Sequence, residues 1–250
     1  MADSATLYGD LLIKVIANTI YGDMPFDPWS GGKFEDALRA EGRDWPSRAH
    51  SMAGVRRLEN VRILVERALK EGVPGDLIET GVWRGGCCIL MRGLLAAHGV
   101  TDRRVFVADS FEGLPPPQED KYAADKGDRH HTFEELKVSV DDVRLNFERY
   151  GLLDEQVTFL KGWFKDTLPT LDRGQRFAVI RLDGDMYGST IDALTHLYPK
   201  LSPGGFCIID DYGAVPACQQ AVTDYCKGID FEPDLNRVDW TGAWWQKPAA

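Results

Sequence analysis

The 250 residues carry a net charge of −10 and 44% of them are hydrophobic, values typical of a globular protein. No cluster of lysine and arginine could displace counterions from a phosphate backbone, so we expect no nucleic-acid partner. No apolar run is long enough to span a bilayer, and residues 1–20, with Asp3 and Asp10, lack a signal-peptide pattern. We therefore expect a cytoplasmic protein without membrane contact.

The front of the chain, residues 1–72, is predicted to be helical. Residues 3–21 and 33–42 have helical patterns, separated by a loop that contains Pro25 and Pro28. Residues 48–71 form a longer amphipathic pattern that stops before Pro74-Gly75. No recognisable chemistry lies here, so we interpret 1–72 as a helical extension of the same domain that serves as a cap or an oligomer contact.

From residue 73 onwards, apolar runs alternate with helical patterns. The runs are continuous rather than alternating, which indicates strands of a parallel sheet covered on both faces. Expected strands are 77–80, 105–108, 157–160, 177–182 and 205–209, and expected helices are 87–98, 134–150, 188–201 and 214–227. Residues 236–247 are Trp-rich and are predicted to form an antiparallel edge strand. Residues 73–250 thus form the α/β core.

The five cysteines indicate neither a disulfide framework nor a zinc site. Their number is odd and no CxxC spacing occurs. Cys87, Cys88 and Cys207 lie in apolar runs and are predicted to be small core residues.

The first strand leads directly into a glycine-rich turn, Gly81-Val82-Trp83-Arg84-Gly85-Gly86, and then a helix. Such a strand, turn and helix N-terminus holds a nucleotide-like ligand in α/β sheets. Glu79 at the strand end would suit a cofactor with hydroxyls and a cationic amine better than a phosphate. The alternative is an ordinary turn with a surface glutamate.

Polar residues also follow the second and third strands. Asp109, beside Ser110, stands where a carboxylate can accept both ribose hydroxyls of a nucleoside, unless it only caps the following turn. Trp163, after Gly162, is delivered to the same edge, where it could stack on an adenine or fill the core.

Four carboxylates end the fourth and fifth strands: Asp183, Asp185, Asp210 and Asp211. Because adjacent strands lie ~5 Å apart, these acids should crowd and raise each other's pKa. A hard divalent cation would relieve the repulsion. The alternative, that an acid is only a helix cap facing solvent, applies most readily to Asp185.

A long polar segment, residues 114–133, separates the second and third strands and contains His130 and His131. A loop of this length in a compact domain is commonly a lid or a binding loop, the alternative being surface disorder.

Several of these motifs, in this order, resemble the macrocin O-methyltransferase family, which methylates sugar hydroxyls of macrolide and related glycosylated antibiotics. The matching stretches are 79–86, 107–111, 161–169, 182–187 and 209–212. The resemblance implies a Rossmann-like class I methyltransferase fold with a mostly parallel seven-stranded sheet and an antiparallel C-terminal edge. It implies S-adenosylmethionine at Glu79, Gly81, Asp109, Ser110, Gly162 and Trp163, and Mg²⁺ at Asp183, Asp210 and Asp211.

The resemblance further implies that residues 45–52, including Met52, contribute to the cofactor or acceptor pocket and to homodimer contacts, which gives His50 some interest. The acceptor would be a glycosylated small molecule. Mg²⁺ would act as Lewis acid and template for its hydroxyl. Catechol-type enzymes place a lysine where this chain has Met186, so we predict Asp183 as ligand and base, with Asp185 or a lid histidine in reserve.

Three other functions remain open at this point. A phenolic or catechol acceptor would use the same metal chemistry. An NAD-dependent oxidoreductase shares the sheet, but its GxGxxG loop is missing. A non-catalytic binding protein is disfavoured by the intact set of carboxylates.

Overall fold

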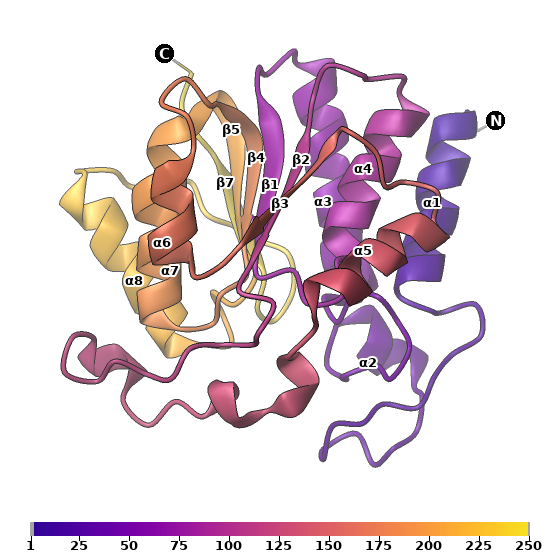
Figure 1. The fold of residues 1–250 in the computed structure, drawn as a ribbon, viewed down its shortest axis with the longest axis horizontal. Coiled ribbons are helices and arrows are strands. Elements are labelled where there is room, and N and C mark those ends of the chain that lie inside the picture. The colour runs from indigo at the N-terminus through magenta and orange to yellow at the C-terminus, as the bar shows by residue number, and fades with distance from the viewer. Residues whose placement is uncertain (1–2, 250) are drawn as a thin grey trace.

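A computed structural model describes residues 3–249 and contains a mixed seven-stranded sheet between two layers of helices (Figure 1). The strand order is β3-β2-β1-β4-β5-β7-β6. Strands β1 to β5 are parallel and β6 and β7 are antiparallel to their neighbours. The bounds are β1 (Asp76–Thr80), β2 (Val105–Asp109), β3 (Val157–Lys161), β4 (Phe177–Leu182), β5 (Leu201–Ile209), β6 (Asn236–Arg237) and β7 (Ala243–Gln246). The predicted fold class is confirmed.

The helices divide between the two faces of the sheet (Figure 1). One layer contains α1 (Ser4–Ile16), α3 (Gly54–Lys70), α4 (Gly86–Ala97) and α5 (Val140–Arg149). The other contains α6 (Phe164–Thr167), α7 (Tyr187–Leu197) and α8 (Pro216–Gly228). The short α2 (Asp36–Ala40) lies beyond the carboxyl ends of the strands, as does the lid segment 114–133. Among residues 3–249 no helix is both long and apolar enough to cross a membrane.

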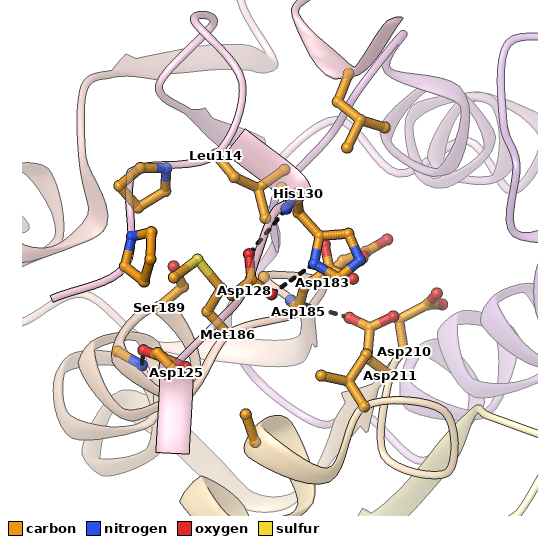
Figure 2. A pocket seen from close by; sticks show the side chains of 18 of the residues that line it. Leu114, Asp125, Asp128, His130, Asp183, Asp185, Met186, Ser189, Asp210 and Asp211 are labelled. Carbon is orange, nitrogen blue, oxygen red and sulfur yellow. Dashed lines mark hydrogen bonds and ion pairs between the residues drawn. The ribbon is translucent and has the colours of Figure 1, made fainter. Parts of the chain in front are cut away.

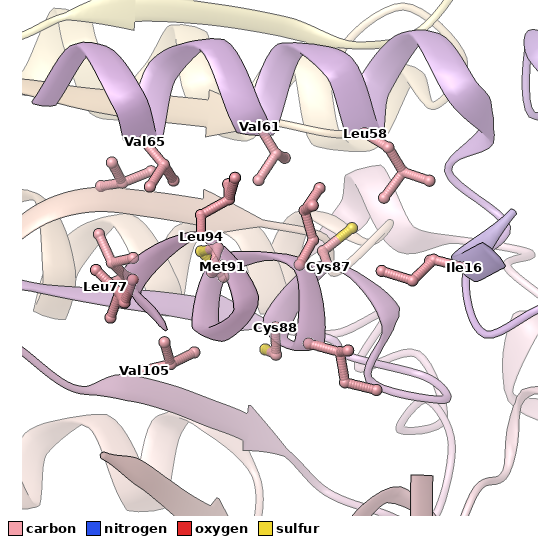
Figure 3. Packing of buried hydrophobic residues seen from close by; sticks show 14 of the residues in the cluster. Ile16, Leu58, Val61, Val65, Leu77, Cys87, Cys88, Met91, Leu94 and Val105 are labelled. Atoms are coloured by element: carbon pink, nitrogen blue, oxygen red, sulfur yellow. The ribbon is translucent and has the colours of Figure 1, made fainter. Parts of the chain in front are cut away.

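The core fills the space between the sheet and each helix layer. Figure 3 shows Leu58, Val61 and Val65 of α3 facing the α4 side chains that include Met91 and Leu94. A second cluster packs α7 and α8 on the opposite face. All five cysteines are free and buried, so the core role predicted for three of them is confirmed.

Several predicted helix boundaries were wrong: α1 ends at Ile16 and not at 21, and α5 begins at Val140 and not at 134. Helix α3 begins at Gly54 and not at 48, because the preceding segment is bound elsewhere: the N–H of Arg48 donates to Asp23 Oδ2 at 2.6 Å. Asp23 in turn pairs with the fully buried Arg39. Residues 17–53, which include the short α2, are therefore folded as an ordered segment against the carboxyl edge of the sheet.

Candidate active site

A cavity of about 990 Å³ opens at the carboxyl ends of the parallel strands (Figure 2). Its wall combines strand ends, the front segment and the lid. Among its lining residues are Met52, Gly81, Asp109, Ser110, Trp163, Asp183, Asp185, Asp210 and Asp211, all predicted site residues. Glu79 and Gly162 do not line it. The structure thus gathers most of the predicted site into one space.

The turn after β1 is shaped by contacts that exclude side chains. Gly81 has φ +80°, and a Cβ on it would lie 1.6 Å from the carbonyl oxygen of Asp183. A Cβ on Gly86 would lie 2.4 Å from the carbonyl oxygen of His50. Between them, the Trp83 indole N–H donates to the carbonyl of Glu135 at 2.9 Å. The turn therefore connects β1, the front segment and the residues that directly follow the lid.

Glu79 is placed differently from the expectation. Its side chain is buried behind the cavity, where it accepts bonds from the guanidinium of Arg181 and, at 2.9 Å, from the thiol of Cys88. These partners leave it facing the interior of the sheet. In this structure Glu79 anchors Arg181, and its contact with a cofactor stays a prediction.

Asp109 faces the cavity and also organises two turns. Its Oδ2 accepts the N–H of Val82 and its Oδ1 accepts the N–H of Phe111, each at 2.7 Å. Burial raises the pKa of Asp109, and these two N–H groups oppose that effect. The backbone carbonyl of Asp109 accepts the N–H of Gly162 at 2.9 Å, which brings the β3 turn and Trp163 to the same side. Both alternatives considered for Asp109 are thus compatible, since one carboxylate can cap turns and still face a ligand.

Three carboxylates converge at the ends of β4 and β5. Asp183, Asp185 and Asp211 each offer an oxygen, and these oxygens lie within 4.8 Å of one another. The N–H of Asp185 donates to Asp211 Oδ2 at 3.1 Å, which fixes the turn. Burial, together with the nearby charge of Asp210, raises the pKa of Asp183 to about 8. Burial and the surrounding carboxylates likewise raise the pKa of Asp211 well above its usual value.

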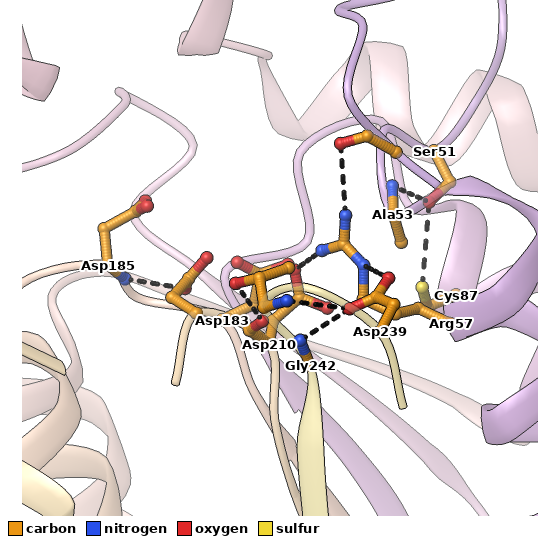
Figure 4. A network of polar contacts seen from close by, with 12 residues as sticks. Ser51, Ala53, Arg57, Cys87, Asp183, Asp185, Asp210, Asp239 and Gly242 are labelled. Carbon is orange, nitrogen blue, oxygen red and sulfur yellow. Dashed lines mark hydrogen bonds and ion pairs between the residues drawn. The ribbon is translucent and has the colours of Figure 1, made fainter. Parts of the chain in front are cut away.

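Asp210 lies beside this cluster but pairs with two arginines, of which Figure 4 shows Arg57. It accepts hydrogen bonds from Arg57 and Arg181, both buried. Arg181 also donates to Asp183 at 2.8 Å, and Arg57 lies 3.2 Å from Asp239. The structure therefore places Asp185, rather than Asp210, with the other two acids of the cluster.

Sequence reasoning missed these two arginines. A signal was available for Arg181, because it is the one charged residue in the otherwise apolar strand Phe177–Leu182. Arg57 belongs to an amphipathic helix, and nothing in the sequence pattern distinguishes it from the neighbouring Arg56, which is exposed.

The histidines differ in their surroundings. His50 Nδ1 lies 2.8 Å from the hydroxyl of Tyr150, and burial with the adjacent Arg84 lowers the pKa of His50 to about 4. His130 lines the cavity, and its Nδ1 lies 2.6 Å from Asp128 Oδ2. Burial lowers the pKa of His130, but the charges of Asp185 and Asp128 outweigh this effect, so the pKa is raised overall. His131 does not line the cavity.

The strand order, the antiparallel last pair and the cavity at the strand ends define a Rossmann-like methyltransferase. A sequence profile of the macrocin-O-methyltransferase (TylF) family matches residues 9–247, and the chain belongs to that family. It is an O-methyltransferase.

Characterised relatives match almost end to end. The chain is 54% identical over 250 residues (99% of this chain, 95% of the relative) to the 8-demethyl-8-(2,3-dimethoxy-α-L-rhamnosyl)-tetracenomycin-C 4′-O-methyltransferase of Streptomyces olivaceus. It is 48% identical over 248 residues (97% of each chain) to the mycinamicin III 3″-O-methyltransferase of Micromonospora griseorubida. The solved structure of the O-methyltransferase NovP superposes with a TM-score of 0.93 at 52% identity, covering 98% of this chain and 100% of that one.

Proposed function

We propose that this enzyme transfers a methyl group from S-adenosylmethionine to a sugar hydroxyl of a glycosylated natural product, with a divalent metal ion such as Mg²⁺. The names of the relatives support the acceptor class, since they describe methylation of rhamnosyl-tetracenomycin and of mycinamicin. The observation that carries the metal is the group of carboxylates on the cavity wall.

The donor set fits a hard cation. Carboxylate oxygens are the ligands that Mg²⁺ prefers, and Mg²⁺ retains waters that a hydroxyl can replace. Asp183 and Asp211 belong both to the predicted set and to the observed cluster, so we assign them as ligands. Asp185 completes the cluster as observed, whereas the sequence and the resemblance predict Asp210. A bound divalent ion would supply Lewis acidity and a fixed position for the sugar oxygen.

The donor half of the cavity also fits its proposed ligand. S-adenosylmethionine supplies a methyl group already activated on a sulfonium. Gly81 lines the cavity, with the Asp183 carbonyl oxygen filling the place of its missing Cβ, and Trp163 offers an aromatic face. The oxygens of Asp109 accept two backbone N–H groups and, at 3.4 Å, the Ser110 hydroxyl, and since a carboxylate has about four acceptor positions, capacity remains for a ribose hydroxyl. Met52 and Ser110 would complete this part of the wall.

Asp183 is the base we assign for the acceptor hydroxyl. The Arg181 guanidinium holds its Oδ2 at 2.8 Å, which orients the carboxylate and leaves Oδ1 for the cavity. Met186 occupies the position where catechol-type enzymes place lysine, so no amine competes for the proton there. Asp185 and His130 line the same wall and are the reserve candidates.

The size and covering of the cavity suit two ligands at once. Its volume of about 990 Å³ is at the upper end of small-molecule sites, which are ~300–1,000 Å³. Lid residues from Leu114 to His130 form much of the wall. We propose that they contact the acceptor, because the donor contacts above come from the sheet edge and the front segment.

A homodimer is the proposed assembly. Leu7, Leu11 and Val15 of α1 are 59%, 53% and 40% exposed and recur every four residues, so they form one apolar stripe on the helix. A second copy is the occupant we propose for this stripe. Light scattering on the wild type and on Leu11→Glu would test it, and a monomeric wild type would refute it.

The function is tested by mass spectrometry of a panel of glycosides incubated with enzyme, S-adenosylmethionine and Mg²⁺. We expect a gain of ~14 Da on the sugar of at least one glycoside, and none when EDTA is present. Free catechols serve as the competing acceptor class. Methylation of a catechol but of no glycoside would refute the sugar acceptor, and full activity in EDTA would refute the metal.

A further inference from the structure

The lid is attached to helix α7 by a buried carboxylate that none of the chemistry above uses. Asp125 ends the short 3-10 helix η1 (Ala123–Asp125) and is only 2% exposed. Its Oδ1 accepts the N–H of Tyr187 at 2.6 Å and its Oδ2 accepts the N–H of Gly188 at 3.0 Å. Asp125 thus caps the N-terminus of α7 from a segment more than sixty residues away in sequence.

Helix α7 needs this cap, because its own flanking residue provides none. The N-cap position is Met186, whose side chain cannot accept a hydrogen bond from the first turn. The free N–H groups of a helix start require partners, and a carboxylate there also interacts favourably with the helix dipole.

A second contact seats the lid on the same turn. The ring of Tyr122 lies against Gly188, where a Cβ would come within 2.9 Å of it. Its centroid is 5.3 Å from that of Tyr187, whose hydroxyl bonds to Asp224 of α8 at 3.1 Å. Glycine at position 188 is therefore what lets the lid approach α7 this closely.

The capped turn directly follows the carboxylate turn of the active site. Residues 183–186 connect the end of β4 to the first residue of α7, and Asp185 in this connection has φ +53°. Figure 2 shows Asp125 on the side of Met186 and Ser189, with Asp183 and Asp185 beyond them on the same wall. The cap and the carboxylates thus belong to one continuous piece of backbone.

We propose that Asp125 is a positioning residue for methyl transfer: it fastens the lid to α7 and thereby holds the Asp183–Met186 turn in place beneath the acceptor. When the lid is docked on α7, the lid wall of the cavity and the carboxylates of the Asp183–Met186 turn are held in place together. When it is not, the first turn of α7 loses both caps. The kinetic consequence rests on the proposed function, whereas the attachment of the lid does not.

Asp125→Ala tests the attachment, and Asp120→Ala is its matched control. Asp120 is an exposed acid of the same lid, so its removal changes the charge equally without touching α7. Trypsin sites at Lys121, Lys126 and Arg129 are exposed on the lid and report its opening. We expect lid cleavage, followed by mass spectrometry, to be at least tenfold faster in Asp125→Ala and within twofold of wild type in Asp120→Ala.

Two further variants keep the test decisive if Asp125→Ala does not fold. Asp125→Asn retains one amide oxygen as acceptor and should give an intermediate cleavage rate. Gly188→Ala keeps the Asp125 carboxylate but crowds the lid, because its Cβ would lie 2.9 Å from the Tyr122 ring and 3.3 Å from Asp125 Oδ2, while alanine favours the helix itself. We therefore expect trypsin to cleave the lid at least fivefold faster in Gly188→Ala than in the wild type, without a fall in the melting temperature.

Kinetics separate positioning from stability. For Asp125→Ala we expect kcat to fall at least tenfold and KM for the glycoside to rise, in protein that is fully folded at the assay temperature. A loss of folded enzyme alone would lower kcat with KM unchanged. Equal lid cleavage in wild type, Asp120→Ala and Asp125→Ala would overturn the proposal, as would faster cleavage with unchanged kcat and KM. A wild type that methylates no sugar would refute the proposed function instead, and the cleavage rates would still decide the attachment.

Discussion

The guanidinium of Arg181 on β4 donates from Nη1 to Oδ2 of Asp183, the first residue after that strand, at 2.8 Å. The same guanidinium reaches Glu79 on β1 and Asp210 after β5. One buried cation therefore links the three central strands of the sheet at the edge where the cavity opens.

Replacing Arg181 should destabilise the whole fold. Arg181→Gln leaves three carboxylates without their shared cation, and breaking a buried ion pair costs about 3–5 kcal/mol. We expect the free energy of unfolding, from urea denaturation, to fall by at least about 3 kcal/mol. Arg173→Gln, an exposed arginine just before the same strand, should change it by less than about 0.5 kcal/mol. Equal effects of the two variants would contradict the role given to Arg181.

The metal-free enzyme should lose stability as the pH rises. The pKa of Asp183 is about 8 when folded against an ordinary value of 3.8, so between these values the folded state binds the extra proton. Stability then falls with increasing pH across this range and levels off above pH 8, with a slope of up to about 1.4 kcal/mol per pH unit for one group.

Denaturation in EDTA from pH 5 to 9 would measure this slope. Asp183→Asn should reduce it, and Mg²⁺ should flatten it because the cation favours the charged carboxylates. If the free energy of unfolding in EDTA rose with pH instead, it would contradict the raised pKa that we attribute to the buried, crowded acids.

Removing one carboxylate of the cluster should weaken metal binding. We expect Asp211→Asn to raise the Kd for Mn²⁺, measured by titration calorimetry or electron paramagnetic resonance, at least tenfold. Asp234→Asn, an exposed acid outside the cavity, is the control and should leave the Kd unchanged. The same titration of Asp185→Asn and Asp210→Asn identifies the third ligand. Unaltered binding in Asp211→Asn would remove the assignment of this cluster as the metal site.

Gly81 should be irreplaceable by alanine. A Cβ at this position meets the Asp183 carbonyl oxygen at 1.6 Å in addition to the strain of φ +80°. We expect Gly81→Ala to lower the free energy of unfolding by at least about 3 kcal/mol. Gly72→Ala separates the two effects, because Gly72 has φ +65° but nothing within 4 Å of its would-be Cβ. Its cost should be only the roughly 1–2 kcal/mol of the left-handed backbone, and a similar cost for both variants would refute the steric argument.

Much of the fold could be predicted because its signals are local. Continuous apolar runs located all five parallel strands, and the Trp-rich end became the antiparallel β7. Tertiary contacts decided what local patterns could not. Residues 48–53 look helical but are not, because Asp23 binds the N–H of Arg48 where the helix would begin, and the single-turn α6 is too short to show a periodicity.

The sequence predicted where the site lies better than it predicted which residues pair with one another there. Acids at successive strand ends had to meet at one edge, and Asp183, Asp185 and Asp211 do so. Their partners come from elsewhere in the chain: Arg57 on α3 pairs with Asp210, and Asp125 on the lid caps α7. Sequence spacing contains no information about such pairings, because each depends on how separate elements pack.

The attachment of the lid to α7 also sets a condition for engineering. A lid taken from a relative to change which glycoside is accepted brings its own anchoring residues with it. If the graft lacks an acid at position 125 and an aromatic ring at 122 to match Gly188, the transplanted segment loses these contacts with α7. Chimeras should therefore exchange the tip of the lid and keep residues 122–125 from the recipient.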